Sequence, residues 1–186
     1  LAISSQYNLG TLVTESSHAD TRNLSDLSVN NLPEAISVLK GLDRNALSVL
    51  SGKFKEICYL KNAVRDTFIS GNNVYFCGCG ATGRLSLTIE TLWRQVNEGK
   101  PMGNRVFSFM SGGDVALIRS IENFEDYPLY GARQLAEAGF KDGDLLIGTT
   151  EGGETPFVIG AVEEAAKLSK RKPFFRRSWK YSQPYF

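Results

Sequence analysis

The chain has 186 residues, of which 42% are hydrophobic, and a formal net charge of +1. This length supports one hydrophobic core, so we expect a single main domain. The sequence has no apolar run near the ~18 residues that a membrane-spanning helix needs and no basic-then-apolar leader at its start. We therefore expect a cytoplasmic protein with no membrane partner.

The N-terminal part is polar before it becomes helical. Residues 1–31 are rich in Ser, Asn and Thr, and we expect an irregular lead-in there. A helix is predicted to begin near Leu32, because Pro33 suits a first helical turn. A second, longer helix is predicted over about 43–68, where apolar residues recur at three-, four- and seven-residue steps: Leu47, Leu50, Phe54, Ile57, Val64 and Phe68.

The rest of the chain repeats a strand–helix unit. Apolar, β-prone runs begin at Val74, Val106 and Leu145, with a weaker run at Pro173. Helical patterns lie between them at 84–97, 115–122, 129–138 and 155–168. Strands this far apart cannot form hairpins, so the sequence predicts a parallel sheet with helices on both faces, an α/β fold. Ligands of such sheets bind beyond the carboxyl ends of the strands.

Three glycine-rich loops follow the predicted strands, at 78–83, 111–114 and 149–155. The first reads Gly-Cys-Gly-Ala-Thr-Gly, which fits the spacing of a dinucleotide-binding loop. A dinucleotide site also needs an acid at the end of the next strand, and Asp114 comes too late to bind the ribose. No Gly-Lys-Ser/Thr follows, which excludes a Walker loop. The loop is interpreted as a phosphate cradle at a helix start, the alternative being a tight turn without a ligand.

The third loop indicates a second helix start at the same edge. Thr155 is a natural N-cap and Pro156 a natural first helical residue. The hydroxyls of Thr149 and Thr150 suit a sugar or a phosphate. Glu151 and Glu154 would repel a phosphate. They accept hydrogen bonds from sugar hydroxyls or face solvent, and the sequence leaves both interpretations open.

The three cysteines do not form a disulfide framework. Cys77 and Cys79 have a spacing that can bind metal, but the single histidine, His18, lies far upstream and no second cysteine pair exists. We expect reduced thiols in the cytoplasm, no metal and no cofactor.

These loops resemble the sugar isomerase (SIS) domain, in the branch that contains N-acetylmuramic acid 6-phosphate etherase and the glucokinase regulatory protein. The resemblance covers most of residues 10–174. It rests on five sequence segments: 10–18, Gly-Cys-Gly-Ala-Thr-Gly-Arg-Leu (78–85), Ser-Gly-Gly-Asp (111–114), Glu-Asn-Phe-Glu-Asp (122–126) and Gly-Gly-Glu-Thr-Pro-Phe-Val-Ile-Gly-Ala (152–161). It implies a flavodoxin-like, three-layer αβα fold, a phosphorylated sugar as ligand and a homodimer.

The resemblance, together with the loop chemistry, gives a set of candidate substrate-binding residues. Thr82 matches the loop Ser/Thr that binds phosphate and Thr155 the family's threonine at the third loop, whereas Gly152 replaces a serine. The full set is Gly80, Thr82, Gly83, Arg84, Ser86, Ser111, Gly112, Thr149, Thr150, Gly152, Gly153 and Thr155.

The same resemblance implies one candidate catalytic residue. The etherase uses two glutamates as acid and base, and the second corresponds to Glu125. The first should stand seven residues after Leu85, where this chain has Leu92. Glu90 lies two positions earlier, a helical rotation of roughly 200°, which predicts the opposite face of the helix. Glu125 has a structural alternative, an acid on a solvated helix or turn.

The C-terminal tail departs from the resemblance. Residues 165–186 contain seven Lys and Arg and no acid, so residues 1–164 carry a net charge of −6. The tail has no helical period, and we expect no nucleic-acid partner. We expect three segments: a lead-in with a first helix (1–42), the SIS domain (43–175) and an atypical tail (176–186) of a truncated or frame-shifted product. Three functions remain open: a phosphosugar-binding protein that senses or holds its ligand, an etherase-type lyase that releases D-lactate, and an inactive fragment.

Overall fold

The structure is a computed structural model that describes residues 16–119, 121 and 123–169. The chain divides into two compact units, one formed by residues 10–62 and the other containing residues 63–169. Each unit is described by itself. The candidate strand at 173–175 and the tail at 176–186 lie outside the described residues.

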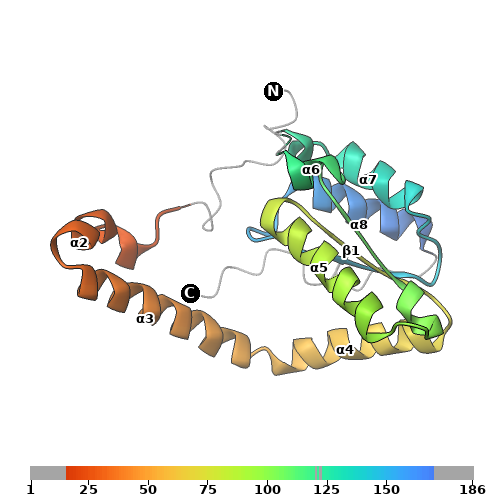
Figure 1. Cartoon of the computed structure of the whole chain (residues 1–186), viewed down its shortest axis with the longest axis horizontal. Coiled ribbons are helices and arrows are strands. Elements are labelled where there is room, and N and C mark those ends of the chain that lie inside the picture. Colours follow the sequence, from red (N-terminus) through yellow and green to blue (C-terminus); the bar gives the residue numbers. More distant parts are fainter. Residues whose placement is uncertain (1–15, 120, 122, 170–186) are drawn as a thin grey trace. The chain divides into compact units, whose positions relative to one another are not determined.

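The first unit is helical (Figure 1). After the short helix η2 (Ala19–Thr21) come α2 (Leu24–Asn30) and α3 (Leu32–Ser51), and α4 (Phe54–Ile69) crosses the boundary between the units. The expected irregular lead-in is therefore wrong for 24–30. The start of α3 is as predicted, with Pro33 in its first turn and the Asn31 side chain accepting a hydrogen bond from the Glu34 N–H.

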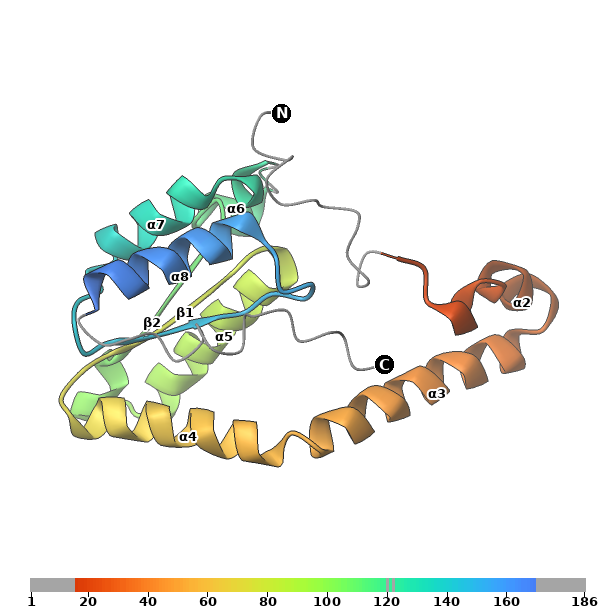
Figure 2. The same ribbon diagram turned by 180° about the vertical axis from the view of Figure 1, so that it is seen from behind.

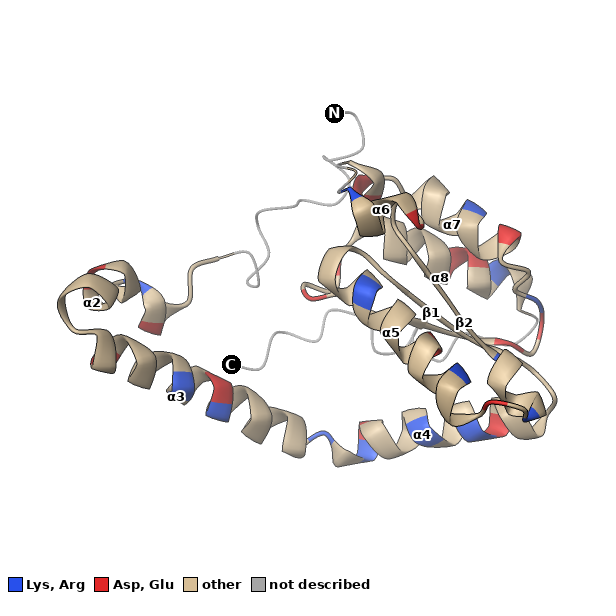
Figure 3. Cartoon of the chain, in the orientation of Figure 1, with Lys and Arg blue, Asp and Glu red and all other residues tan. Residues whose placement is uncertain are grey.

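The predicted helix over 43–68 is two helices, not one. Gly52 ends α3, and its N–H donates to the carbonyls of Ser48 and Val49 at 3.2 and 3.1 Å. Glycine has a low helix propensity, so the helix breaks there although the apolar stripe continues. That stripe is exposed at Leu47, Leu50 and Phe54. Charged side chains of both signs are spread along α3 and α4 (Figure 3).

The second unit contains a three-stranded parallel sheet. Its strands are β1 (Val74–Gly78), β2 (Val106–Met110) and β3 (Leu145–Gly148), in the order β2-β1-β3. Val74 pairs with Val106 on one side and with Leu145 on the other. The three strands predicted at these positions are confirmed, and the carboxyl ends of all three lie at one edge.

Helices cover both faces of this sheet (Figures 1 and 2). α5 (Gly80–Val96) packs on β1 and β2, while α7 (Pro128–Glu137) and α8 (Pro156–Leu168) lie together on the other face. Short elements join them: η3 (Pro101–Asn104), α6 (Val115–Ile118) and η4 (Phe124–Asp126). The arrangement is the expected three-layer α/β fold. The main core lies between the sheet and the two helices α7 and α8, and it includes Tyr75, Cys77, Leu135, Phe157 and Ala161.

Two glycines let α7 and α8 approach each other backbone to backbone. A Cβ at Gly131 would lie 1.9 Å from the Phe157 carbonyl oxygen, and a Cβ at Gly160 would lie 1.9 Å from the Pro128 carbonyl oxygen. No side chain fits at either position. This close crossing fixes the start of α7 against α8.

Polar contacts connect the amino ends of the strands. The buried carboxylate of Asp144 accepts hydrogen bonds from the N–H groups of Asn73 and Lys141 at 2.8 and 3.0 Å. Arg105 donates to the carbonyls of Phe68 and Asn72, which places a cation at the C-terminal end of α4. Such a cation is favourable because a helix C-terminus carries partial negative charge.

We expect Gly131→Ala and Gly160→Ala each to lower the free energy of unfolding by about 1–3 kcal/mol, the usual cost of overpacking. The matched control is Gly41→Ala, because no atom lies within 4 Å of the Cβ position of that helical glycine. There the change should raise the free energy of unfolding by up to about 1 kcal/mol. Urea unfolding of the three variants measures this, and equal stabilities would contradict the close crossing.

Candidate functional site

The three glycine-rich loops meet at the carboxyl edge of the sheet. The Ser111 N–H donates to the Gly78 carbonyl at 3.2 Å, which joins the second loop to the first. The Thr149 N–H donates to the Cys77 carbonyl at 2.8 Å, which joins the third loop to β1. The candidate residues of three separate segments therefore share one edge.

The glycines of the first loop have different roles. Gly80 begins α5 with a φ of 50°, and no atom lies within 4 Å of its Cβ position, so the space above it is open. Gly83 is a packing residue, since a Cβ there would lie 2.7 Å from the Cβ of Met110. The first N–H groups of α5 have no acceptor within the helix and suit an anion. Gly80 is thus the glycine at which a ligand can approach the backbone.

The two hydroxyls predicted to bind a ligand near this helix start are turned inward. The Thr82 hydroxyl donates to the Cys79 carbonyl at 2.8 Å and accepts from the Cys79 N–H at 3.2 Å. The buried Ser86 hydroxyl donates to the Thr82 carbonyl at 2.9 Å. Both hydroxyl protons are already used. In this state Thr82 and Ser86 shape the loop, and backbone N–H groups remain for an anion.

The second loop is tied to α5 by side chains. Arg84 donates from Nη2 to the Ala116 carbonyl at 3.3 Å, which joins α5 to α6. Gly112 has a φ of 82°, and a Cβ there would lie 2.9 Å from the Cβ of Ala116. Ser111 is buried and hydrogen-bonds Cys79. Arg84 and Ser111 therefore hold the loop in place.

The third loop forms the predicted helix start. Thr155 is the N-cap of α8 and Pro156 follows in the first turn. The Thr155 hydroxyl makes no capping bond to the helix and instead lies 2.7 Å from the Thr150 hydroxyl. Gly152 and Gly153 lie in the bend before it, and no atom lies within 4 Å of the Cβ position of Gly153. The paired hydroxyls thus belong to the loop that connects β3 to the N-terminus of α8.

Glu125 is brought to the first loop although 46 positions separate it from Cys79. Burial and then the charge of Glu125 raise the pKa of the Cys79 thiol to about 12, and a hydrogen bond from Ser111 acts in the opposite direction. Burial also raises the pKa of Cys77 to about 12. Both thiols are thus held protonated and are poor nucleophiles. Among the described residues, no group of three or more His, Cys, Asp and Glu is arranged to hold a metal.

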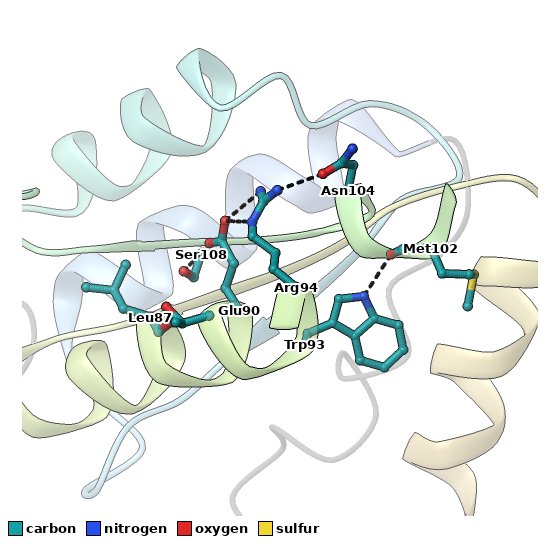
Figure 4. Close-up of polar contacts among 8 residues, drawn as sticks. Leu87, Glu90, Trp93, Arg94, Met102, Asn104 and Ser108 are labelled. Carbon is teal, nitrogen blue, oxygen red and sulfur yellow. Dashed lines mark hydrogen bonds and ion pairs between the residues drawn. The ribbon is translucent and has the colours of Figure 1, made fainter. Parts of the chain in front are cut away.

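Glu90 lies on the side of α5 that faces Ser108 of β2 and does not take the place of a base at position 92 (Figure 4). Its carboxylate accepts hydrogen bonds from Arg94, at 2.8 Å from Nη2, and from the Ser108 hydroxyl on β2. Arg94 also donates to the Asn104 side chain at 3.0 Å. Leu92 is 54% exposed. The two positions lie on different faces of the helix, as their spacing predicts.

A groove of about 640 Å³ lies at the opposite edge of the sheet, lined by residues between Arg94 and Asn104. It surrounds the C-terminal end of α5, where the helix dipole disfavours an anion. Arg94 lines this groove, but its guanidinium already pairs with Glu90. The groove therefore does not suit an anion. We place the candidate site at the carboxyl edge, where the N-termini of α5 and α8 lie.

One feature of this edge was missed by the sequence analysis. The rings of Phe124, Tyr127 and Tyr130 contact one another: Phe124 and Tyr130 are stacked with centroids 4.9 Å apart, and Tyr127 is tilted against Tyr130 at 5.3 Å. Their regular three-residue spacing is the signal that would have found them. We call these three residues the aromatic strip.

The family model of the glucokinase regulatory protein N-terminal SIS domain matches residues 56–166, more than half of the chain. The chain belongs to this SIS-domain family.

Related proteins named N-acetylmuramic acid 6-phosphate etherase occur in several bacteria. The chain is 30% identical over 161 residues to the protein of Aliivibrio fischeri, covering 87% of the chain and 52% of the relative. It is 32% identical over 163 residues to that of an Enterobacter species, with the same coverage. The chain thus spans about half the length of these curated relatives. In the described ranges, no helix combines the length and apolarity needed to cross a membrane.

We expect Glu125→Gln to lower the pKa of Cys79, because the nearby negative charge is removed, while burial keeps the pKa above its ordinary value. More thiolate at pH 9 then means faster alkylation of Cys79. Site-resolved mass spectrometry measures this rate, with Cys58 in the same protein as the internal reference. The matched control is Glu151→Gln, a charge that does not contribute to the shift of Cys79. Equal Cys79 rates in both variants would contradict the position of Glu125.

Proposed function

We propose that this SIS-domain chain binds a phosphorylated sugar at the carboxyl edge of its sheet and senses or holds it. The observation that carries the proposal is that α5 begins at Gly80, just after β1, and that α8 begins at Pro156, after the loop 149–155 that follows the neighbouring strand β3. Two helix N-termini then offer free N–H groups and favourable dipoles to one anion. The family match supports the same class of ligand.

The phosphate contacts are proposed to come mainly from the backbone. Gly80 leaves open space beside the first N–H groups of α5, and Gly153 does so in the loop before α8. Thr150 and Thr155 supply hydroxyls that can exchange their mutual bond for a ligand. Four further residues of the proposed site act by fixing the loops: Thr82, Arg84, Ser86 and Ser111. The remaining proposed residues are Gly83, Gly112, Thr149 and Gly152.

The sugar part is proposed to face acidic side chains. Glu125 and Asp126 lie in η4, and Glu151 and Glu154 lie in the loop before α8, where Figure 3 shows acidic residues. Carboxylates accept hydrogen bonds from sugar hydroxyls. The same charges oppose a free phosphate ion, so they favour an amino-sugar or hexose phosphate over inorganic phosphate.

A lyase that releases D-lactate is the second candidate function, because the relatives carry the etherase name and Glu125 lies beside the first loop. Abstraction of a proton from carbon needs a carboxylate in position. Leu92 stands at the position implied for it, and Glu90 is engaged with Arg94 and Ser108. We therefore favour binding over catalysis. Release of D-lactate from N-acetylmuramic acid 6-phosphate, stopped by Glu125→Gln, would reverse this preference.

We further propose a homodimer in the cytoplasm. α5 exposes a stripe of apolar side chains, Leu85, Leu92 and Val96, at 53%, 54% and 73% of their surface. Burial of such a stripe favours association. The three free cysteines support a reducing compartment. Light scattering after size exclusion gives the mass, and a monomer at all concentrations would contradict the dimer.

We expect N-acetylglucosamine 6-phosphate at 100 times its dissociation constant to stabilise the protein by ~2.7 kcal/mol, and unphosphorylated N-acetylglucosamine to give no such effect. Gly80→Ala should weaken binding at least about tenfold, because a methyl group fills the open space and a lost hydrogen bond to a charged group costs about 1.5–3 kcal/mol. Thermal unfolding and isothermal calorimetry measure both effects.

The matched control is Gly139→Ala. Gly139 also has a positive φ, 83°, and an open Cβ position, but it follows α7 at the other edge of the sheet. The backbone strain of a left-handed alanine is then similar in both variants. Equal affinity of Gly80→Ala and Gly139→Ala would contradict the proposed phosphate position.

A further inference from the structure

The aromatic strip presents a half-exposed apolar surface. Phe124, Tyr127 and Tyr130 are 37%, 40% and 42% exposed. The Phe124 and Tyr130 rings are stacked and the Tyr127 ring is tilted against Tyr130, so the three side chains support one another. Tyr127 makes no side-chain capping bond although it is the N-cap of α7. Helix capping therefore does not explain this row of rings.

The strip lies at the edge proposed to bind the ligand. Glu125 and Asp126, between Phe124 and Tyr127, are both close enough to Cys79 to raise its pKa. The Pro128 carbonyl, next in the chain, lies against α8 at Gly160. η4 also packs against α8. The strip thus lies near the first loop and against α8, at the start of α7.

The residue just before the strip has an unusual backbone conformation. Asn123 has a φ of 69°, the single positive φ of a non-glycine residue in the part of the chain that the structure describes. Asparagine tolerates this left-handed conformation better than most residues do. The conformation is still less favourable in free energy than a right-handed one. Asn123 is the N-cap of η4, so this turn leads directly into the segment that carries Phe124.

We propose that the aromatic strip binds the sugar ring of the phosphosugar and determines specificity for the sugar part, an inference that rests on the proposed function. A pyranose has an apolar face of C–H groups and an edge of hydroxyls. The negatively polarised face of an aromatic ring attracts the C–H groups. Glu125 and Asp126 in the same segment accept the hydroxyls. The strip therefore offers both kinds of contact that a sugar ring needs, beside a cradle for its phosphate.

The composition of the strip favours a sugar over other stacking ligands. A nucleotide base would find no side-chain amide or cation in 124–127, which reads Phe-Glu-Asp-Tyr. A cationic ligand would suit the two acids but would not be drawn to helix N-termini. A neutral ring that carries several hydroxyls and one phosphate satisfies both parts of the edge.

The test compares two probes and two substitutions at one position. Tyr127→Ala removes the ring, and Tyr127→Phe keeps it while removing the phenol oxygen. Dissociation constants are measured by calorimetry for N-acetylglucosamine 6-phosphate and for inorganic phosphate. We expect Tyr127→Ala to bind the sugar phosphate about three- to tenfold more weakly and inorganic phosphate as the wild type does, whereas Tyr127→Phe binds both like the wild type.

A second variant, Phe124→Leu, keeps apolar bulk and removes the other outer ring, so it tests the strip even if Tyr127→Ala fails to fold. It should weaken sugar phosphate binding and leave inorganic phosphate binding unchanged. If folded Tyr127→Ala and Phe124→Leu bind the sugar phosphate with wild-type affinity, this inference is overturned while the proposed function stands. Absence of binding of both probes to the wild-type protein would overturn the proposed function and this inference with it.

Discussion

The parallel pairing of β1 with both of its neighbours is the constraint on which the candidate site depends. Parallel strands cannot be joined by a tight turn, so each connection must return over a face of the sheet. This places the carboxyl ends of β1, β2 and β3 at one edge and starts α5 and α8 there. Loops that are about 30 to 40 residues apart in the sequence become neighbours for this reason alone.

Close approach of backbone to backbone then gives the edge its detailed shape. Gly131 and Gly160 bring α7 against α8, and Gly83 brings α5 against β2. In each case a glycine is required by contact with a neighbour and not by a ligand. Gly80 differs, because the space at its Cβ position is open. The glycine pattern of the first loop therefore combines a packing role with one point of access to the helix N-terminus.

The sequence predicted the elements better than it predicted the directions of side chains. Strand positions, the parallel sheet and the cap at Thr155 follow from apolar periodicity and local capping rules, which depend on neighbours in the chain. The inward hydroxyls of Thr82 and Ser86 were not predicted, because such side chains bond to their own helix backbone instead of a ligand. The break at Gly52 was missed because the apolar stripe continues across it. The three-residue spacing of Phe124, Tyr127 and Tyr130 signals a row of rings, but its position beside the first loop and α8 depends on tertiary placement.

The central claim is that a phosphorylated sugar binds against the N-termini of α5 and α8. The most direct measurement is an NMR titration of ¹⁵N-labelled protein with N-acetylglucosamine 6-phosphate. The account predicts saturable shifts of the backbone amide signals of Gly80, Ala81 and Phe157, in the first turns of these helices, and unchanged signals of Gly99 and Lys100 in the groove at the other edge. Shifts confined to Gly99 and Lys100, or no shifts at millimolar ligand, would contradict it.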